Sequence, residues 1–160
     1  MSCPAMKLHA QRGMALLVSL VFLLLLTLIG ISSMQSATLQ EKMANSVTLR
    51  NQSFQRAEAA LRLGESAVQV STYALPVCSG NIRCAPPAES SLITVAGFNS
   101  TSGVTWIAAG DGFYGVQNIG TTLNAVNVPS NTSATLYRIT AVAIVGNNVR
   151  SVVESIYAKY

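Results

Sequence analysis

The chain has 160 residues, which is room for one domain of ordinary size, and half of them are hydrophobic, with a mean hydropathy of +0.42. Charged residues make up 10% of the sequence, and the formal net charge is +4. This charge is too small and too dispersed for a nucleic-acid-binding surface, so we predict no direct binding to nucleic acid.

The sequence begins with a short basic leader followed by an apolar segment. The leader, residues 1–13, contains two basic residues and no acidic residue, and it ends in Gly13. Residues 14–31 are uncharged and would form a helix of about 27 Å, close to the ~30 Å hydrocarbon core of a bilayer. Basic residues favour the cytoplasmic flank, so the chain after Gln35 is expected on the opposite side of the membrane.

Two other interpretations of the apolar segment are a secretory signal peptide and a plain membrane anchor. An ordinary secretory signal peptide fits poorly, because the segment is longer than the usual apolar region and residues 32–37 contain no A-x-A cleavage site. A plain membrane anchor remains open on this segment alone, because eighteen apolar residues need no further purpose.

The next segment predicts a continuation of the same helix. No proline occurs between Met34 and Tyr73, and apolar residues recur at helical spacing. We predict one helix from Met14 to near Tyr73, membrane-spanning over residues 14–34 and amphipathic over residues 35–73. Its length of roughly 90 Å exceeds what a compact domain requires and suits a filament of packed N-terminal helices. We interpret one apolar stripe as its core-facing side: Leu39, Met43, Val47, Phe54, Leu61 and Val68, with Ala57 and Gly64 between them.

Residues 74–160 predict a β-rich region. Short runs of β-branched and aromatic residues alternate with clusters of Gly, Asn and Ser. The last two runs are separated by Gly146, Asn147 and Asn148, which indicates a β-hairpin. We expect an antiparallel sheet of at least four strands packed on the amphipathic half of the helix, an α+β fold. The predicted strands are residues 92–96, 104–108, 113–119, 123–128, 135–145 and 149–157.

The sequence contains three cysteines, of which Cys3 lies in the leader. Removal of the leader would leave Cys78 and Cys84, which we expect to form a disulfide in an oxidising compartment. Closing this seven-residue loop would stabilise the fold by roughly 2 kcal/mol on the chain-entropy estimate. A redox or metal site is the weaker alternative, because the spacing is C-x5-C and no further ligand is available after the leader.

Candidate catalytic residues are scarce. The single histidine, His9, lies in the leader, and the acidic residues after Tyr73 are the scattered Glu89, Asp111 and Glu154. Without a histidine or an unpaired cysteine, the usual base and nucleophile chemistry has little to work with. The glycines on both sides of Asp111 indicate a turn rather than a calcium loop. We therefore predict that the protein is not an enzyme and needs no cofactor or metal.

The leader ending in QRG, the apolar helix directly after it, and the stretch LQEKMANSVTLRNQSFQRAEAALRLGE resemble the N-terminal region of PilX-type minor pilins of the type IV pilus, over about residues 11–66. The ending YRITAVAIVGNNVRSVVESIYAKY is also similar to that family's ending. The resemblance implies a type IV pilin-like fold. It also implies that prepilin peptidase cuts between Gly13 and Met14 and N-methylates Met14.

The resemblance further implies a minor pilin that primes pilus assembly near the tip and supports twitching motility and surface attachment. The implied partners are the inner membrane, other minor pilins and the major pilin, prepilin peptidase, the inner-membrane assembly platform and a tip adhesin. The implied location is the inner membrane of a Gram-negative bacterium, with the C-terminal region in the periplasm, and the pilus tip after assembly.

Three positions depart from the major-pilin pattern. Met14 stands where phenylalanine is usual, and Gln35 stands where major pilins often have proline. Val18, the fifth residue counted from Met14, stands where major pilins have a glutamate. These differences argue against a shaft-forming major pilin. Two alternatives remain open, a pseudopilin of type II secretion and a periplasmic binding or adhesion domain on a plain anchor.

Overall fold

The computed structural model describes residues 11–160, with side chains from Met14 onward. These residues fall into two compact units, one ending at Ser46 and the other comprising Val47–Tyr160. The elements in chain order are α1 (Gln11–Gln69), α2 (Gly80–Cys84), the 3-10 helix η1 (Ala88–Ser91), β1 (Gly97–Phe98), β2 (Thr105–Ala109), β3 (Gly112–Thr122), β4 (Ala134–Val145) and β5 (Val149–Lys159).

The unit that ends at Ser46 consists of the first part of α1. Every described side chain in it is exposed, which is unusual for a segment so rich in leucine. The hydroxyls of Ser19 and Thr27 donate to backbone carbonyls one turn earlier, at 2.8 Å each, so these polar groups are satisfied within the helix. In the part of the chain that the structure describes, α1 is the one helix long and apolar enough to cross a membrane.

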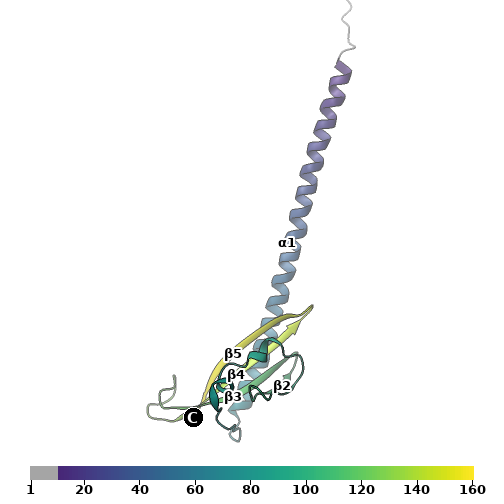
Figure 1. Cartoon of the computed structure of the whole chain (residues 1–160). Helices are drawn as coiled ribbons and strands as arrows, with labels where there is room; N and C mark the ends of the chain where they lie inside the picture. Colours follow the sequence, from purple (N-terminus) through teal and green to yellow (C-terminus); the bar gives the residue numbers. More distant parts are fainter. Residues whose placement is uncertain (1–10) are drawn as a thin grey trace, which may run out of the picture. The chain divides into compact units, whose positions relative to one another are not determined.

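The unit Val47–Tyr160 contains the rest of α1 and a five-stranded sheet (Figure 1). The strands are ordered β1-β2-β3-β4-β5, and each pairs antiparallel with the next. The C-terminal part of α1 packs on one face of this sheet. The predicted α+β fold, a long helix on an antiparallel sheet, is therefore confirmed.

Glycine and asparagine make the two tight turns of the sheet. Ala109 pairs with Gly112, so β2 and β3 are joined by a two-residue turn in which Gly110 has a φ of 57°. The turn expected around Asp111 is thus present. Three residues join β4 to β5, where Gly146 has a φ of 56° and Asn148 a φ of 71°. Both residue types tolerate this left-handed region, which explains the predicted hairpin.

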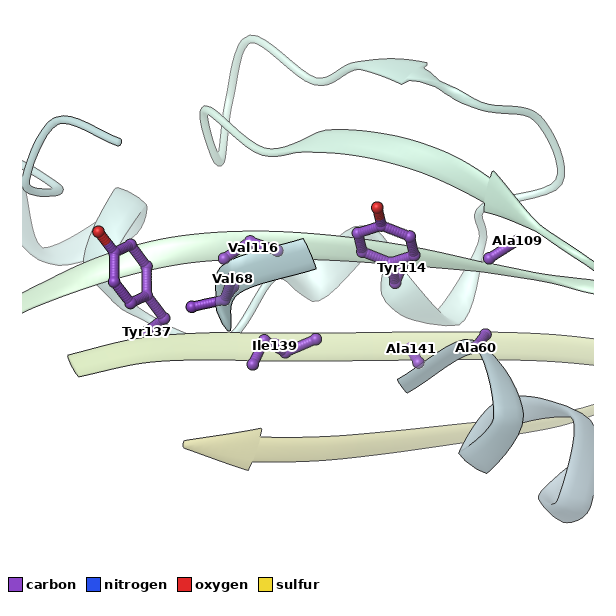
Figure 2. Packing of buried hydrophobic residues seen from close by; sticks show 8 residues of the cluster. All are labelled: Ala60, Val68, Ala109, Tyr114, Val116, Tyr137, Ile139 and Ala141. Atoms are coloured by element: carbon purple, nitrogen blue, oxygen red, sulfur yellow. The ribbon is translucent and has the colours of Figure 1, made fainter. Parts of the chain in front are cut away.

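Small residues let α1 lie close to the sheet (Figure 2). Ala57 and Ala60 are buried there, and Gly64 faces the buried side chains of Tyr114 and Ile139. A Cβ atom added to Gly64 would lie 2.7 Å from Cγ2 of Ile139, closer than packed carbon atoms approach. The helix can therefore approach the sheet this closely only because position 64 has no side chain.

The predicted core stripe is only partly correct. Val68 is buried, and Leu61 packs at the edge of the core, but Val47 and Phe54 are 56% and 52% exposed. Residues seven apart drift by about 20° per heptad around a straight helix. The stripe therefore winds from the core at Val68 to the outside at Val47, and Leu39 and Met43, in the other unit, are exposed as well.

Two of the predicted strands are wrong. Residues 92–96 follow η1 as an irregular segment, and the carbonyls of Ser90 and Ile93 accept hydrogen bonds from Arg150 at 3.2 and 2.7 Å instead of joining a sheet. Residues 123–128 form a loop with Asn127 at a φ of 62°. Leu123 and Val126 in this loop are 59% and 84% exposed.

α1 also ends earlier than predicted, at Gln69 rather than near Tyr73. Beyond the end of the helix, Nζ of Lys159 donates to the carbonyls of Val70 (2.6 Å) and Tyr73 (3.0 Å). A cation is favoured beside the free carbonyls at the C-terminus of a helix. The last strand of the sheet thus holds the segment that leaves the helix.

Candidate functional site

The predicted processing residues lie at the start of α1. Gly13 and Met14 are in its first turns, and Met14 is 68% exposed. Residues 1–10 of the leader, including Cys3, Lys7 and His9, lie outside the described residues. Cleavage between Gly13 and Met14 and methylation of Met14 therefore stay predictions.

The apolar surface of α1 is the most extensive candidate for an interaction. No charged residue occurs between Arg12 and Glu41, and the side chains of residues 14–40 are all exposed in their unit. Val18, where major pilins have glutamate, is 48% exposed in the same apolar surface. An apolar helix of this length needs lipid or other helices around it, because water disfavours so large an apolar surface.

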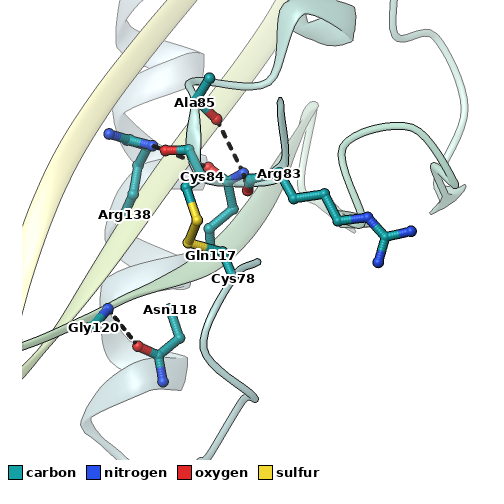
Figure 3. Close-up of a disulfide and its surroundings, with 8 residues drawn as sticks. All are labelled: Cys78, Arg83, Cys84, Ala85, Gln117, Asn118, Gly120 and Arg138. Carbon is teal, nitrogen blue, oxygen red and sulfur yellow. Dashed lines mark hydrogen bonds between the residues drawn. A yellow bond between two sulfur atoms is a disulfide. The ribbon is translucent and has the colours of Figure 1, made fainter. Parts of the chain in front are cut away.

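A second candidate is the loop closed by a disulfide (Figure 3). Cys78 and Cys84 are joined with an S–S distance of 2.02 Å and a Cα–Cα distance of 5.3 Å, as the cysteine count predicts. The loop is tied to the sheet where the backbone N–H of Cys78 donates to the carbonyl of Asn118 at 2.8 Å. Neither cysteine has a free thiol for catalysis or metal binding.

Polar side chains from the sheet hold the other end of this loop (Figure 3). Nε2 of Gln117 donates to the carbonyls of Arg83 (2.7 Å) and Ala85 (3.1 Å). Arg138 donates to the carbonyl of Cys84 at 2.7 Å and forms an ion pair of 3.1 Å with Glu154. The loop is thus fixed at several backbone atoms as well as by its disulfide.

Sequence reasoning missed Gln117 and Arg138 as anchors. The two residues are paired in the register of β3 and β4, and both strands are otherwise largely apolar. A long polar side chain within each of two largely apolar strands is the sequence signal that marks Gln117 and Arg138. It would not have shown which loop they bind.

Glu89 anchors the following segment in a similar way. Its carboxylate accepts hydrogen bonds from the hydroxyl of Ser102 and, at 3.2 Å, from the indole N–H of Trp106. Trp106 is buried with Val104 and Val142 against the face of the sheet away from α1. The carboxylate of Glu89 therefore joins the segment after the disulfide loop to Ser102 and to the buried Trp106.

The ionisable groups of the described residues are mostly paired or dispersed. Arg62 lies 2.6 Å from Glu58, and this hydrogen bond raises the pKa of the arginine. Burial raises the pKa of Tyr73 to about 12, with smaller contributions from Tyr114 and Tyr137. The described residues include no group of three or more His, Cys, Asp or Glu side chains that could hold a metal.

The described residues combine an uncharged leucine-rich helical segment, an antiparallel sheet, and a contact between helix and sheet that is made by small residues. These features define a pilin-like α+β architecture. Residues 12–62 match the family model described as PilX N-terminal. The match covers about a third of the chain; it confirms the resemblance over these residues and supports a PilX-type type IV pilin. Comparisons with curated proteins and with solved structures gave no match.

Proposed function

We propose that this protein is a minor pilin that helps to initiate type IV pili and remains near their tips in low copy. In that position it supports twitching motility and surface attachment. The proposal is carried by the uncharged, uncovered surface of α1, which includes Val18. The match of residues 12–62 to a pilin family supports the same class of protein.

The proposal includes a maturation step and a location. Prepilin peptidase removes residues 1–13 and N-methylates Met14. Residues 14–34 then hold the protein in the inner membrane, residues 35–73 continue the helix, and residues 74–160 form the periplasmic region. The proposed partners are the other minor pilins, the major pilin, the assembly platform in the inner membrane and a tip adhesin.

Val18 is the residue that favours an early place in the filament. In a major pilin, the glutamate at this position can pair with the N-terminal amine of the subunit inserted before it. A carboxylate without a partner costs on the order of 2.5–3.5 kcal/mol at the centre of a membrane helix, and less near its end. The first subunits have few or no predecessors, so an uncharged side chain avoids an unpaired acid.

Immunogold labelling of sheared pili tests the location. Label confined to the ends of pili is expected, at a small fraction of the major pilin. Label spread evenly along the shafts, at a ratio near that of the major pilin, would refute the proposal. A deletion strain should make few pili, and normal numbers of pili in that strain would refute the priming role.

Substitution at Val18 tests whether an unpaired acid at this position hinders the first subunits of a filament. Val18→Glu should reduce the number of pili, because it adds an acid that has no partner in the first subunits, while Val18→Ile should leave the number unchanged. Immunoblotting of membranes must show both variants inserted in equal amount. Unchanged pilus numbers with Val18→Glu would show that the missing glutamate does not define the place of this subunit.

A further inference from the structure

A cavity of about 450 Å³ opens in the unit Val47–Tyr160 beside β3. Along the same edge of β3, β2 pairs only as far as Gly115, and the loop after α1 is bonded to Asn118. The cavity occupies the gap between these two contacts and has the volume of a small-molecule site, about 300–1,000 Å³. Its apolar lining includes Leu75, Ile107 and Val116.

Arg83 is the one charged residue among those that line the cavity. Its side chain lies across Gly103, where a Cβ atom would be 3.5 Å from Cδ of the arginine. Figure 3 shows the side chain directed away from the disulfide. Among the described residues its guanidinium has no ion pair and no hydrogen bond, whereas Arg138 and Arg150 both bond within the fold. A planar cation with five N–H donors is therefore available to an anion.

The side chains around the cavity favour a ligand that accepts hydrogen bonds over one that donates them. Tyr73 lines it, and its phenol has no hydrogen bond to the described residues. The phenol of Tyr73 is protonated near neutral pH, as is usual for tyrosine, and can donate a hydrogen bond. Glu89 accepts from the cavity-lining Ser102 and from Trp106, and it forms no ion pair with Arg83. No acidic residue lines the cavity itself.

From this combination we propose that the cavity binds a small organic acid, a carboxylate attached to an apolar or aromatic body. The carboxylate pairs with the guanidinium of Arg83, and the body packs against Leu75, Ile107 and Val116. Arginine suits such a ligand because its planar fork matches the two oxygens of a carboxylate. This binding function is separate from the filament role, and it stands or falls independently of it.

The test uses the purified full-length protein in detergent and two probes of the same shape, indole-3-acetate and its neutral amide, indole-3-acetamide. Saturation-transfer NMR, with empty micelles as the blank, gives the dissociation constant of each. The acid is expected to bind at least roughly tenfold more tightly than the amide. Arg83→Gln should remove this preference, and Arg50→Gln, the same charge change on an exposed part of α1, should retain it.

A second variant covers the apolar part of the site. Thr105→Trp places a large side chain at an exposed, cavity-lining position of β2 and should weaken binding of both probes. Equal affinity for acid and amide, or an unchanged preference with Arg83→Gln, would overturn the proposal. So would undiminished binding to Thr105→Trp, because the probes would then bind elsewhere.

Discussion

The two units contain two parts of one helix that are built on different principles. Residues 14–40 have no charge and present large apolar side chains on every side, all of them exposed. From Val47 onward, the buried face is made of small residues such as Ala57, Ala60 and Gly64, and charges occupy other faces. Small side chains permit close contact with a sheet of the same chain, whereas large uncovered ones require lipid or other subunits.

Hydrophobicity alone therefore does not identify the part of such a helix that packs in an internal core. The most apolar part of α1 belongs to the other unit, and the part that packs in the core of the Val47–Tyr160 unit is rich in alanine and includes Gly64. An internal contact is selected for shape and distance, since a close-packed interior leaves no room for an extra methyl group. Substitutions in the two parts of α1 should therefore affect different properties of the protein.

The largest effect is expected at the predicted cleavage site between Gly13 and Met14. Gly13→Val should leave the protein inserted but uncut and absent from pili, because a side chain at this position should obstruct access to the protease. Mass spectrometry of the purified protein reads the N-terminus directly. Ala15→Val, on the other side of the predicted cleavage site, is the matched control and should mature normally. Normal maturation of Gly13→Val would refute the assigned site.

The next effect is expected where the helix meets the sheet. Gly64→Val should destabilise the Val47–Tyr160 unit by about 2–3 kcal/mol, because the new side chain collides with the buried Ile139. Gly30→Val is the matched control, since nothing lies within 4 Å of the Cβ position there. Trp106, the single tryptophan, is buried, so its fluorescence during thermal unfolding reports on this unit. Equal melting temperatures for the two variants would contradict the close contact.

The sequence predicted the elements of the fold better than the surfaces that join them. Proline-free helical spacing, β-branched runs and the Gly-Asn-Asn turn identified α1, β4 and β5, because these signals are local. The predicted core-facing stripe of the helix is correct at Ala57, Gly64 and Val68. It is wrong at Val47 and Phe54, because residues seven apart drift around a straight helix. Residues 92–96 have the composition of a strand, but the carbonyl of Ile93 accepts a hydrogen bond from Arg150 instead of pairing in a sheet. This contact is distant in sequence, so no local pattern predicts it.

The candidate sites divide in the same way. The disulfide between Cys78 and Cys84 was predicted by counting cysteines along the chain. The cleavage site after Gly13 rests on a similarly local pattern and stays a prediction. The anchors Gln117 and Arg138, and the cavity beside Arg83, depend on which loop folds back over β3, and no local pattern specifies that. Long-range contacts of single polar side chains are set by the assembled tertiary structure.

A smaller effect is expected from the disulfide. Replacing both Cys78 and Cys84 by serine should reduce the free energy of unfolding by about 2 kcal/mol, since the seven-residue loop is short and its ends are held by other hydrogen bonds. A reductant should bring the wild type to the level of this variant and leave the variant unchanged. Two alkylatable thiols at these positions in unreduced protein, detected by mass spectrometry, would contradict the pairing.

The smallest effect is expected at Tyr73, where α1 has ended and the sheet begins to cover the chain. Burial raises the pKa of its phenol from about 10 to about 12 in the folded protein, so the folded state holds the proton more tightly than the unfolded state. The stabilisation from this group is complete below pH 10 and is lost as the pH rises from 10 to 12. Tyr73→Phe should therefore reduce the loss of stability in this alkaline range and change little at neutral pH, because the ring that contacts Tyr137 is kept.

Tyrosinate absorbance measures the pKa of the phenol directly. The difference in absorbance between wild type and Tyr73→Phe should have its midpoint near pH 12 in folded protein and near pH 10 in denaturant. A difference curve centred near 10 in the folded protein would mean that water reaches the phenol freely, and that the segment leaving the helix is not held against the sheet.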